Sequence, residues 1–493
     1  MKTNTRISTF TACTALFAAG TAFAWDGAPI TYINVQLELR EGTLLELNQS
    51  IARIRDTDSR ERQIPFDQLA AIIFEDADTA TETSTGPRAT TPVAQGMIIT
   101  TDRQRLRGKP IEGDPGAESL LWDGPPFGPR VFPLESLLTF RPGSGSEVPV
   151  PNRVDTDIII FKNADRAPTF VESIIATRPE PVAKPDPADN AAPRDPAAWR
   201  RTRRVDRNAA SQRRTVALIS GVVRAEVQNR PTDIPLERIQ AITFANPPER
   251  PKPLPRAWLS DSTVIATSTI SLDVPRTLGN AAPRRLGDSA IQLETPAERP
   301  TLVLTIPQSG PGSQRLASAL QPTPDAAGSV PLRSVEAIAI DASRLVPLSA
   351  CHIRSEPIAN TTRRWTPPAQ VAQADAGSPA PLDALDITLP GPMQIVVDLP
   401  ATSTHVGGIV TLPLSARPLA SCRARVAIID ASSAVHEILS VDLSAQNPSH
   451  PISAAMPRDA SGPFQLRISL EPTDDGPIQD SIVLRRFMVL VEP

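Results

Sequence analysis

One short pattern of large apolar residues recurs along the chain. Its first copy is the eleven-residue segment 64–74, whose large apolar positions are Ile64, Phe66, Leu69, Ile72 and Phe74. These spacings match neither a helix nor a regular strand. They fit the end of a strand, one 3₁₀ turn, in which side chains three apart stack, and a second strand. Pro65 favours extended geometry before the turn, so the pattern predicts strand, turn and strand.

This pattern, which we call the Pro box, returns at 132–140, 234–244 and 330–340. Every copy has proline in its second position. The simpler interpretation is that the Pro box is a structural element of the core with no catalytic or binding role, and we adopt it.

A hairpin signal precedes each Pro box. Alternating apolar and polar residues flank turn residues, and we expect the turns at Glu41-Gly42, Asp102, Asn163 and Asp261. Repeats of this kind predict an array of small β-barrels. We place four modules at 25–80, 95–145, 155–247 and 255–343.

The Pro box resembles the closing segment of small SH3-like and Sm-like β-barrels, which also have an Ile-Pro pair, a 3₁₀ turn and a last strand. In each module the resemblance is limited to the Pro box. It implies a barrel fold for the module. Relatives of this kind often bind nucleic acid or proline-rich peptides, but aromatic residues make up only 4% of this chain. Because base stacking and proline recognition both need clustered aromatic side chains, we expect neither partner.

Composition adds little about partners. The net charge is −4, so we expect no strong attraction to nucleic acid or membranes. The 54 prolines gather in connections. The third module carries a Pro-rich insertion at 178–214, which we expect to be disordered.

The insertion contains a basic loop with Arg200, Arg201, Arg203, Arg204 and Arg207. Such a loop either binds an anionic polymer or headgroup or is simply a solvated surface segment. We favour the solvated segment.

The first residues indicate export. Lys2 and Arg6 precede an apolar run that ends at Ala22-Phe23-Ala24, the layout of a secretory signal peptide covering 1–24. We therefore expect a periplasmic or extracellular protein of the cell envelope. No later apolar run is long enough to span a membrane as a helix, so we expect no transmembrane segment after cleavage.

Two cysteines, Cys351 and Cys422, follow the signal peptide. In an oxidising compartment an even pair predicts one disulfide. Two isolated buried thiols are the alternative.

From residue 345 the strand signals become longer and closer together. We expect strands near 393–399, 409–414, 422–429, 435–443, 464–470 and 481–491. Six or more strands with Pro- and Gly-marked turns predict a β-sandwich of jelly-roll type over 345–493.

This C-terminal region resembles the carbohydrate-binding jelly-roll modules of secreted glycosidases. The resemblance is carried by the strand at 394–400, by Gly407-Gly408, by the strand ending at Asp430, and by Asp442-Leu443. It implies a sandwich fold and sugar as the ligand. The region has no Trp or Tyr after Trp365, however, and sugar sites usually use aromatic faces. The fold can therefore carry over without the ligand.

Candidate chemistry is sparse. Asp474, Asp475 and Asp480 are weak candidates for a metal site, although Asp-Asp-Gly is also an ordinary turn signal. The four histidines are scattered, and neither a nucleophile elbow nor a phosphate-binding loop occurs. We expect no cofactor and no catalytic residues.

Three functional hypotheses follow. The first is an exported, non-catalytic structural or interaction protein with other envelope proteins as partners. The second is a glycan-binding accessory protein that acts through the C-terminal sandwich. The third is a hydrolase whose site the sequence does not display.

Overall fold

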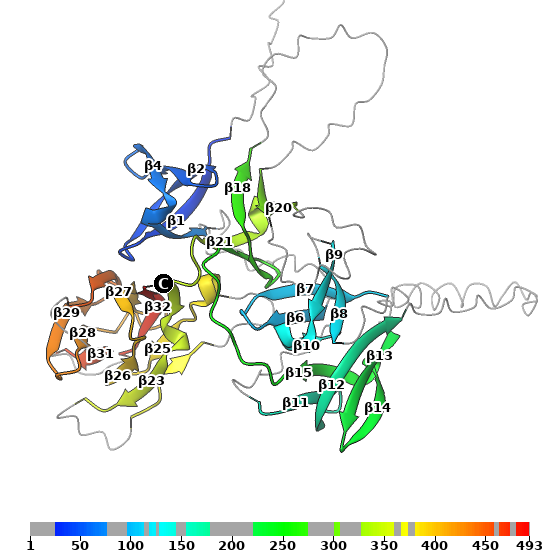
Figure 1. Ribbon diagram of the computed structural model, residues 1–493. Helices are drawn as coiled ribbons and strands as arrows, with labels where there is room; N and C mark the ends of the chain where they lie inside the picture. Colours follow the sequence, from blue (N-terminus) through cyan, green and yellow to red (C-terminus); the bar gives the residue numbers. More distant parts are fainter. Residues whose placement is uncertain are drawn as a thin grey trace, which may run out of the picture.

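The computed structural model describes an all-β protein, as the sequence predicts (Figure 1). Every regular element is a strand or a single 3₁₀ turn in the described residues, which are 25–75, 96–112, 118–124, 128–143, 154–177, 220–274, 300–305, 327–358, 366–372, 380–457, 463–473 and 480–492. The expected signal peptide and basic loop lie outside these ranges. Within them, no helix is long and apolar enough to cross a bilayer.

The first group of strands, module 1, is one antiparallel sheet in the order β5-β1-β2-β3-β4. Its strands are β1 (Ala28–Asn34), β2 (Leu39–Leu47), β3 (Ile51–Asp56), β4 (Glu61–Pro65) and β5 (Leu69–Phe74).

Modules 2 and 3 repeat this order as β10-β6-β7-β8-β9 and β15-β11-β12-β13-β14. The strands of module 2 are β6 (Gly96–Thr100), β7 (Arg105–Pro110), β8 (Ser119–Gly124), β9 (Gly128–Pro133) and β10 (Leu137–Arg141). Those of module 3 are β11 (Asp157–Phe161), β12 (Arg166–Thr177), β13 (Ser220–Val227), β14 (Arg230–Pro235) and β15 (Ile239–Thr243).

Module 4 has the same plan with its second strand broken in two. β21 pairs with β16 and β16 with β17, while β18, β19 and β20 form the other part. The strands are β16 (Arg256–Leu259), β17 (Val264–Ala266), β18 (Thr269–Asp273), β19 (Thr301–Thr305), β20 (Ala327–Pro331) and β21 (Val335–Ala339).

The Pro boxes have the predicted structure. In each copy a strand ends at the proline, a 3₁₀ turn follows, and the next strand begins directly. The turns are η1 (Phe66–Gln68), η3 (Leu134–Ser136), η5 (Leu236–Arg238) and η6 (Leu332–Ser334). In all four copies the N–H of the residue after the turn donates to the carbonyl of the turn's first residue.

The expectation of closed barrels is wrong for the described residues. In each module the outer strands of the order are joined by the 3₁₀ turn and share no ladder of hydrogen bonds. Modules 1, 2 and 3 are therefore open five-stranded antiparallel sheets, and module 4 has six strands in two parts, β21-β16-β17 and β18-β19-β20.

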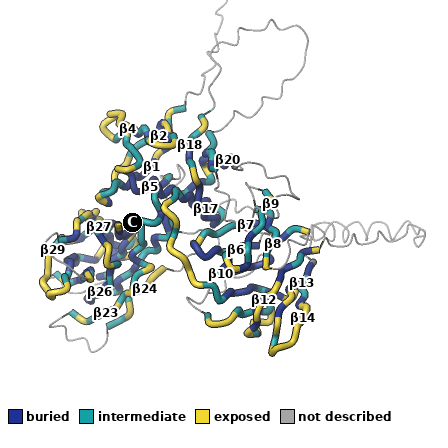
Figure 2. Tube along the Cα trace, in the orientation of Figure 1, coloured by how far each residue is buried: buried dark blue, intermediate teal, exposed yellow. Residues whose placement is uncertain are grey.

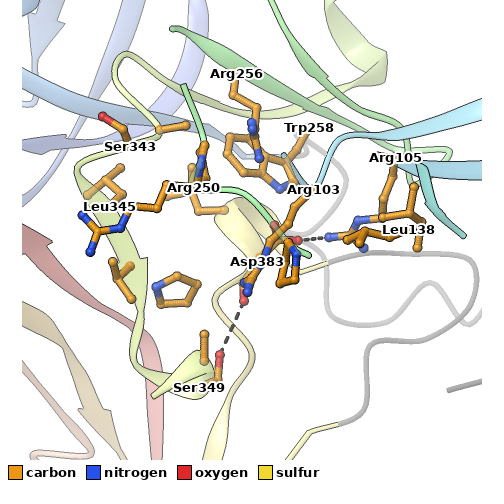
Figure 3. A pocket seen from close by; sticks show the side chains of 18 of the residues that line it. Arg103, Arg105, Leu138, Arg250, Arg256, Trp258, Ser343, Leu345, Ser349 and Asp383 are labelled. Carbon is orange, nitrogen blue, oxygen red and sulfur yellow. Dashed lines mark hydrogen bonds and ion pairs between the residues drawn. The ribbon is translucent and has the colours of Figure 1, made fainter. Parts of the chain in front are cut away.

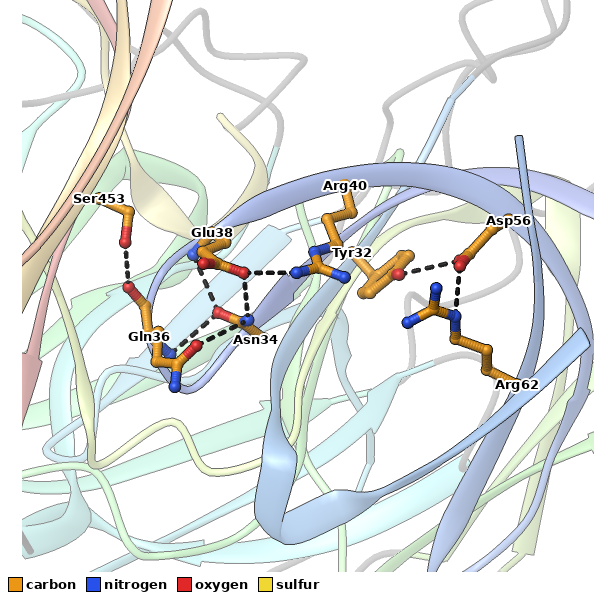
Figure 4. A network of polar contacts seen from close by, with 8 residues as sticks. All are labelled: Tyr32, Asn34, Gln36, Glu38, Arg40, Asp56, Arg62 and Ser453. Atoms are coloured by element: carbon orange, nitrogen blue, oxygen red, sulfur yellow. Dashed lines mark hydrogen bonds and ion pairs between the residues drawn. The ribbon is translucent and has the colours of Figure 1, made fainter. Parts of the chain in front are cut away.

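Three of the expected hairpin turns are confirmed and the first is wrong. Glu41-Gly42 lies inside β2, and the chain turns between Asn34 and Glu38 instead. There the Asn34 side-chain oxygen accepts hydrogen bonds from the backbone N–H groups of Gln36 and Glu38, each at 2.9 Å (Figure 4). An asparagine that bonds its own downstream backbone supplies a turn without glycine. Gly42 is required for another reason: a Cβ there would lie 2.9 Å from the carbonyl oxygen of Arg55.

The modules join in pairs through their closing strands. β5 of module 1 pairs with β21 of module 4 through Ile72 and Ile338, and β10 of module 2 pairs with β15 of module 3 through Phe140 and Ile242. Each pair shares one hydrophobic core, and Figure 2 shows these buried segments inside the modules. β17 also pairs with β7 at Val264 and Arg105, which connects the two pairs.

The C-terminal region forms a sandwich of two antiparallel sheets, with orders β24-β25-β32-β27-β30 and β23-β26-β31-β28-β29. A further strand, β22, pairs with β32. The strands are β22 (Leu345–Pro347), β23 (His352–Glu356), β24 (Gln370–Val371), β25 (Ile387–Leu389), β26 (Met393–Asp398), β27 (Ser403–Thr411), β28 (Cys422–Ile429), β29 (Val435–Leu443), β30 (Ser449–Ala455), β31 (Gln465–Pro472) and β32 (Ile482–Val491).

Strands β25 to β28 alternate between the two sheets, β28 and β29 form a hairpin, and β30 to β32 alternate again. This connectivity is that of a jelly-roll sandwich. Both inner faces contribute to one apolar core. Strand β30 was not predicted from the sequence, because its polar residues and Pro451 give no strand pattern.

The sandwich docks on modules 1 and 4 through a small apolar cluster. Leu37, at the tip of the β1–β2 turn, is 1% exposed and packs beside Gly407 of β27. Met488 and Leu490 of β32 belong to the same cluster. The Ser453 hydroxyl donates to the carbonyl of Gln36 at 2.5 Å at the edge of this contact (Figure 4).

The predicted disulfide is absent, since Cys351 and Cys422 are both free thiols. Cys351 precedes His352, which lies in register with Ile429 at the far end of β28, whereas Cys422 begins that strand. At about 3.3 Å per residue, the length of β28 alone separates the two by roughly 20 Å. A disulfide requires Cα atoms within about 7 Å.

Candidate functional site

A large cavity lies where modules 2, 3 and 4 meet the sandwich (Figure 3). Its volume is about 1200 Å³. Module 2 contributes its first hairpin and β10, module 4 contributes β16, and the sandwich contributes β22 and a 3₁₀ turn, η8 (Pro381–Asp383). The Pro-rich connection between β15 and β16 covers part of it.

Five arginines line this cavity, and we call it the arginine cavity. They are Arg103, Arg105, Arg141, Arg250 and Arg256. The carboxylates among the lining residues are Asp383 and Glu492. The cavity is therefore rich in positive charge, although the whole chain is slightly acidic.

Arg256 is the most deeply buried of the five, at 3% exposed. Its Nη2 donates to the carbonyl of Asp102 at 2.9 Å, whereas its buried Nε has no hydrogen-bond partner among the described residues. Burial lowers the pKa of Arg256; the nearby Asp102 opposes this, and Arg105 and Arg103 add to it.

Trp258 lies two residues further along β16 and faces the same space. Trp258 is 4% exposed, and its Nε1–H has no acceptor among the described residues. Buried donors normally have a partner. Two cavity-lining residues, Arg256 and Trp258, thus each keep one buried N–H group that no described protein atom accepts.

On the sandwich side, η8 places Asp383 against Arg105, and the two form an ion pair (Figure 3). Leu382 and Asp383 both have φ near +60°, and Leu382 is buried. Left-handed backbone is costly for such residues and persists where packing enforces it. The buried Leu382 therefore holds the turn that carries Asp383.

A second polar surface is the outer side of the sheet β23-β26-β31-β28-β29, which we call the polar face. His352, Asp398, Gln465, Ile429 and Val435 form one row across it. The neighbours of the first four along their strands, such as Val397, Leu466 and Ile428, belong to or pack on the core, so these four side chains point outward; Val435 is in register with Ile429 and lies on the same side. The row is polar on three strands and apolar on the last two.

Asp398 is the centre of the polar face. Its carboxylate contacts His352 Nδ1 at 2.9 Å and accepts hydrogen bonds from Gln465 Nε2 at 2.8 Å and Arg354 Nη2 at 3.2 Å. The hydrogen bond with His352 is the main cause that lowers the pKa of Asp398. Asp398 is therefore an exposed, ionised group held in one orientation.

Most residues that the sequence singled out do not form a site. The basic-loop arginines, Asp474 and Asp475 lie outside the described residues. Asp480 is buried at the start of β32, and burial raises its pKa to about 6. No three His, Cys, Asp or Glu side chains in the described part of the chain are grouped to hold a metal.

Sequence reasoning missed both surfaces. The cavity arginines come from modules 2 and 4 and from a connection, and no local motif links them. Arg103, beside the correctly predicted turn at Asp102, was the one available hint. The polar face could not be predicted from the sequence. The alternation of residues within a strand shows which side chains share a face, but it does not show which strands are neighbours in the sheet.

No family model and no curated protein matches the sequence. Parts of the chain are distantly similar in structure to carbohydrate-binding modules. One is a family 51 module of a Clostridium perfringens glycoside hydrolase, solved with methyl-galactose; the match has 11% identity and a TM-score of 0.22, and covers 29% of this chain and 99% of that one.

Two further matches are of the same kind. A second family 51 module with its neighbouring domain, from Clostridium perfringens ZmpB, has 12% identity and a TM-score of 0.23, with 39% of this chain and 37% of that chain covered. The xylan-binding family 22 module of Paenibacillus barcinonensis Xyn10C has 14% identity and a TM-score of 0.18, covering 29% of this chain and 96% of that one.

Proposed function

We propose that this chain is an exported, non-catalytic protein that binds glycans through the polar face of its C-terminal sandwich. The observation that carries the proposal is the cluster around Asp398, in which three donors hold one exposed carboxylate. A preorganised group loses little conformational freedom when a ligand binds.

The chemistry of the face suits a sugar. Sugar hydroxyls both donate and accept hydrogen bonds, and carboxylate, guanidinium and amide groups offer matching acceptors and donors in fixed planes. Asp398, Arg354 and Gln465 supply one of each. Ile429 and half-exposed Val435 continue the same row and give an apolar patch on which the C–H face of a sugar ring can pack.

A structural role for the four N-terminal modules is the second part of the proposal. Their closing strands pair with one another within the chain, β5 with β21 and β10 with β15. Strand edges that would attract other chains are used internally. The modules would then act as a platform for the sandwich.

The test is a glycan-array screen of the chain from residue 25 onward, followed by titration of each hit. We expect saturable binding that Asp398→Ala weakens at least tenfold. Asp273→Ala, which removes an exposed carboxylate on β18, is the matched control and should leave binding unchanged. Equal affinity in both variants, or silence from the folded protein, would exclude the polar face. Intact glycan after long incubation is expected, and release of reducing ends would instead indicate a hydrolase.

A further inference from the structure

We propose that the arginine cavity is a binding site for a small anionic molecule with an apolar body. This site is separate from the polar face, since it lies between the modules and the sandwich, and it does not depend on glycan binding. Its walls come from modules 2, 3 and 4 and from the sandwich, so a ligand there would touch all of these units.

The charge of the cavity indicates an anion. Five guanidinium groups line it against two carboxylates, one of which, Asp383, already pairs with Arg105. Arg103 and Arg250 are exposed and form no ion pair with a described residue. Like charges gathered around a low-dielectric space repel one another, and a bound anion removes that repulsion.

Hydrogen bonding supports the same ligand. The guanidinium groups of Arg103 and Arg250 line the cavity, and both side chains are exposed and carry several N–H donors. An oxyanion is an acceptor only, so it suits such donors. Charge-assisted hydrogen bonds of this type are shorter and stronger than neutral ones.

The remaining wall defines the rest of the ligand. Apolar side chains such as Met97, Leu138 and Phe244 from modules 2 and 3 face Leu345 and Met488 of the sandwich. The volume of about 1200 Å³ exceeds what a simple inorganic ion needs and fits a drug-sized molecule. The cavity therefore favours a carboxylate, sulfate or phosphate group attached to an apolar body.

Two dyes of nearly the same shape provide the test. Anilinonaphthalene sulfonate carries an anionic group, and phenylnaphthylamine has the same ring system without it. We expect the mature chain to bind the sulfonate at one saturable site at least tenfold more tightly than the neutral dye. Sodium sulfate should compete with the sulfonate and leave the neutral dye unaffected.

Variants assign the binding to this cavity. Arg103→Gln with Arg250→Gln changes two exposed side chains and should keep the fold while it lowers affinity for the sulfonate at least tenfold. Arg166→Gln with Arg333→Gln makes the same change of net charge at exposed positions outside the cavity, and should have no effect. The proposal is overturned if both double variants behave alike, or if the two dyes bind equally well.

Trp258 gives an independent readout. Because its indole lines the cavity, the sulfonate should quench part of the intrinsic fluorescence, and Trp258→Phe should abolish that part. Unchanged quenching in Trp258→Phe would place the dye elsewhere and would also overturn the proposal.

Discussion

Leu37 offers the sharpest test of how the sandwich docks on module 1. It is a large apolar residue at the tip of a turn, where solvent exposure is normal, yet it is 1% exposed. Its φ is +59°, a left-handed conformation that costs a leucine roughly 1–2 kcal/mol. The contact with β27 must outweigh this cost. We therefore expect Leu37→Ala to loosen the docking contact without unfolding module 1.

The expected size follows from the packing. Replacing a fully buried leucine by alanine costs about 2–5 kcal/mol, and more where the site cannot collapse. Leu37 packs beside the backbone at Gly407, which cannot move in to fill the space, and its cluster contains several alanines besides larger residues such as Met488 and Leu490. We expect a loss of about 3–4 kcal/mol. For a cooperative unit of roughly 150–250 residues each kcal/mol lowers Tm by about 2–4 °C.

Calorimetry and denaturant unfolding, followed by tryptophan fluorescence, measure the effect, because Trp258 belongs to the same cluster. Leu414→Ala, at a leucine that is 63% exposed, is the matched control and should change stability by less than about 0.5 kcal/mol. Gly407→Ala should imitate Leu37→Ala, since its Cβ would lie 2.7 Å from the Leu37 Cβ.

Leu37→Gly tests the backbone argument. At an ordinary position glycine is about 0.5–1 kcal/mol less stable than alanine. At a left-handed position the strain relieved offsets this, so Leu37→Gly should be as stable as Leu37→Ala, or more so. If Leu37→Ala left the free energy of unfolding unchanged, the docking argument would be refuted. If Leu37→Gly were clearly less stable than Leu37→Ala, the claim of backbone strain at Leu37 would be refuted.

Three further predictions concern single sites. Because burial raises the pKa of Asp480 to about 6, the stability that its protonated form contributes is fully present below about pH 4 and is lost as the pH rises through 6. Asp480→Asn should therefore raise the free energy of unfolding at pH 7.5 by at most about 3 kcal/mol, seen as a higher Tm, and leave it unchanged at pH 4. Cys351 and Cys422 should both react with a thiol reagent after unfolding without reductant, and reductant should not shift Tm. Gly221→Ala, with φ of +155° and its Cβ 2.5 Å from a β12 carbonyl, should destabilise module 3 by more than about 1 kcal/mol, whereas Gly143→Ala, with open space around it, should not.

Local features of the fold could be read from the sequence. The Pro box predicts its turn because proline restricts two residues and the apolar spacing lies within one short segment. The sandwich strands with regular alternation were found for the same reason. The first hairpin failed because two local signals competed: Glu41-Gly42 looks like a turn, but the side chain of Asn34 makes one earlier.

Features that depend on distant residues could not be read in this way. Cys351 and Cys422 are an even pair of cysteines, which predicts a disulfide in an exported protein. Only the order of the strands in the sheet shows that the two residues lie far apart. The arginine cavity needs the mutual positions of modules 2 to 4 and the sandwich. Arg105 and Asp383, which form an ion pair there, are separated by most of the chain.

The pairing of the modules explains why the strand that ends each Pro box is buried along most of its length. Ile72 and Ile338 occupy the same position in their boxes and face each other in the β5–β21 ladder, and Phe140 and Ile242 do so in β10–β15. Antiparallel pairing at equivalent positions relates the two modules by an approximate two-fold axis, as in a symmetric dimer. A module of about 50 residues buries too little surface to be very stable alone, and each pair shares one core. The closing strand is therefore buried both by its own module and by the partner module. Removing either module of a pair would expose both a strand edge and half of a core.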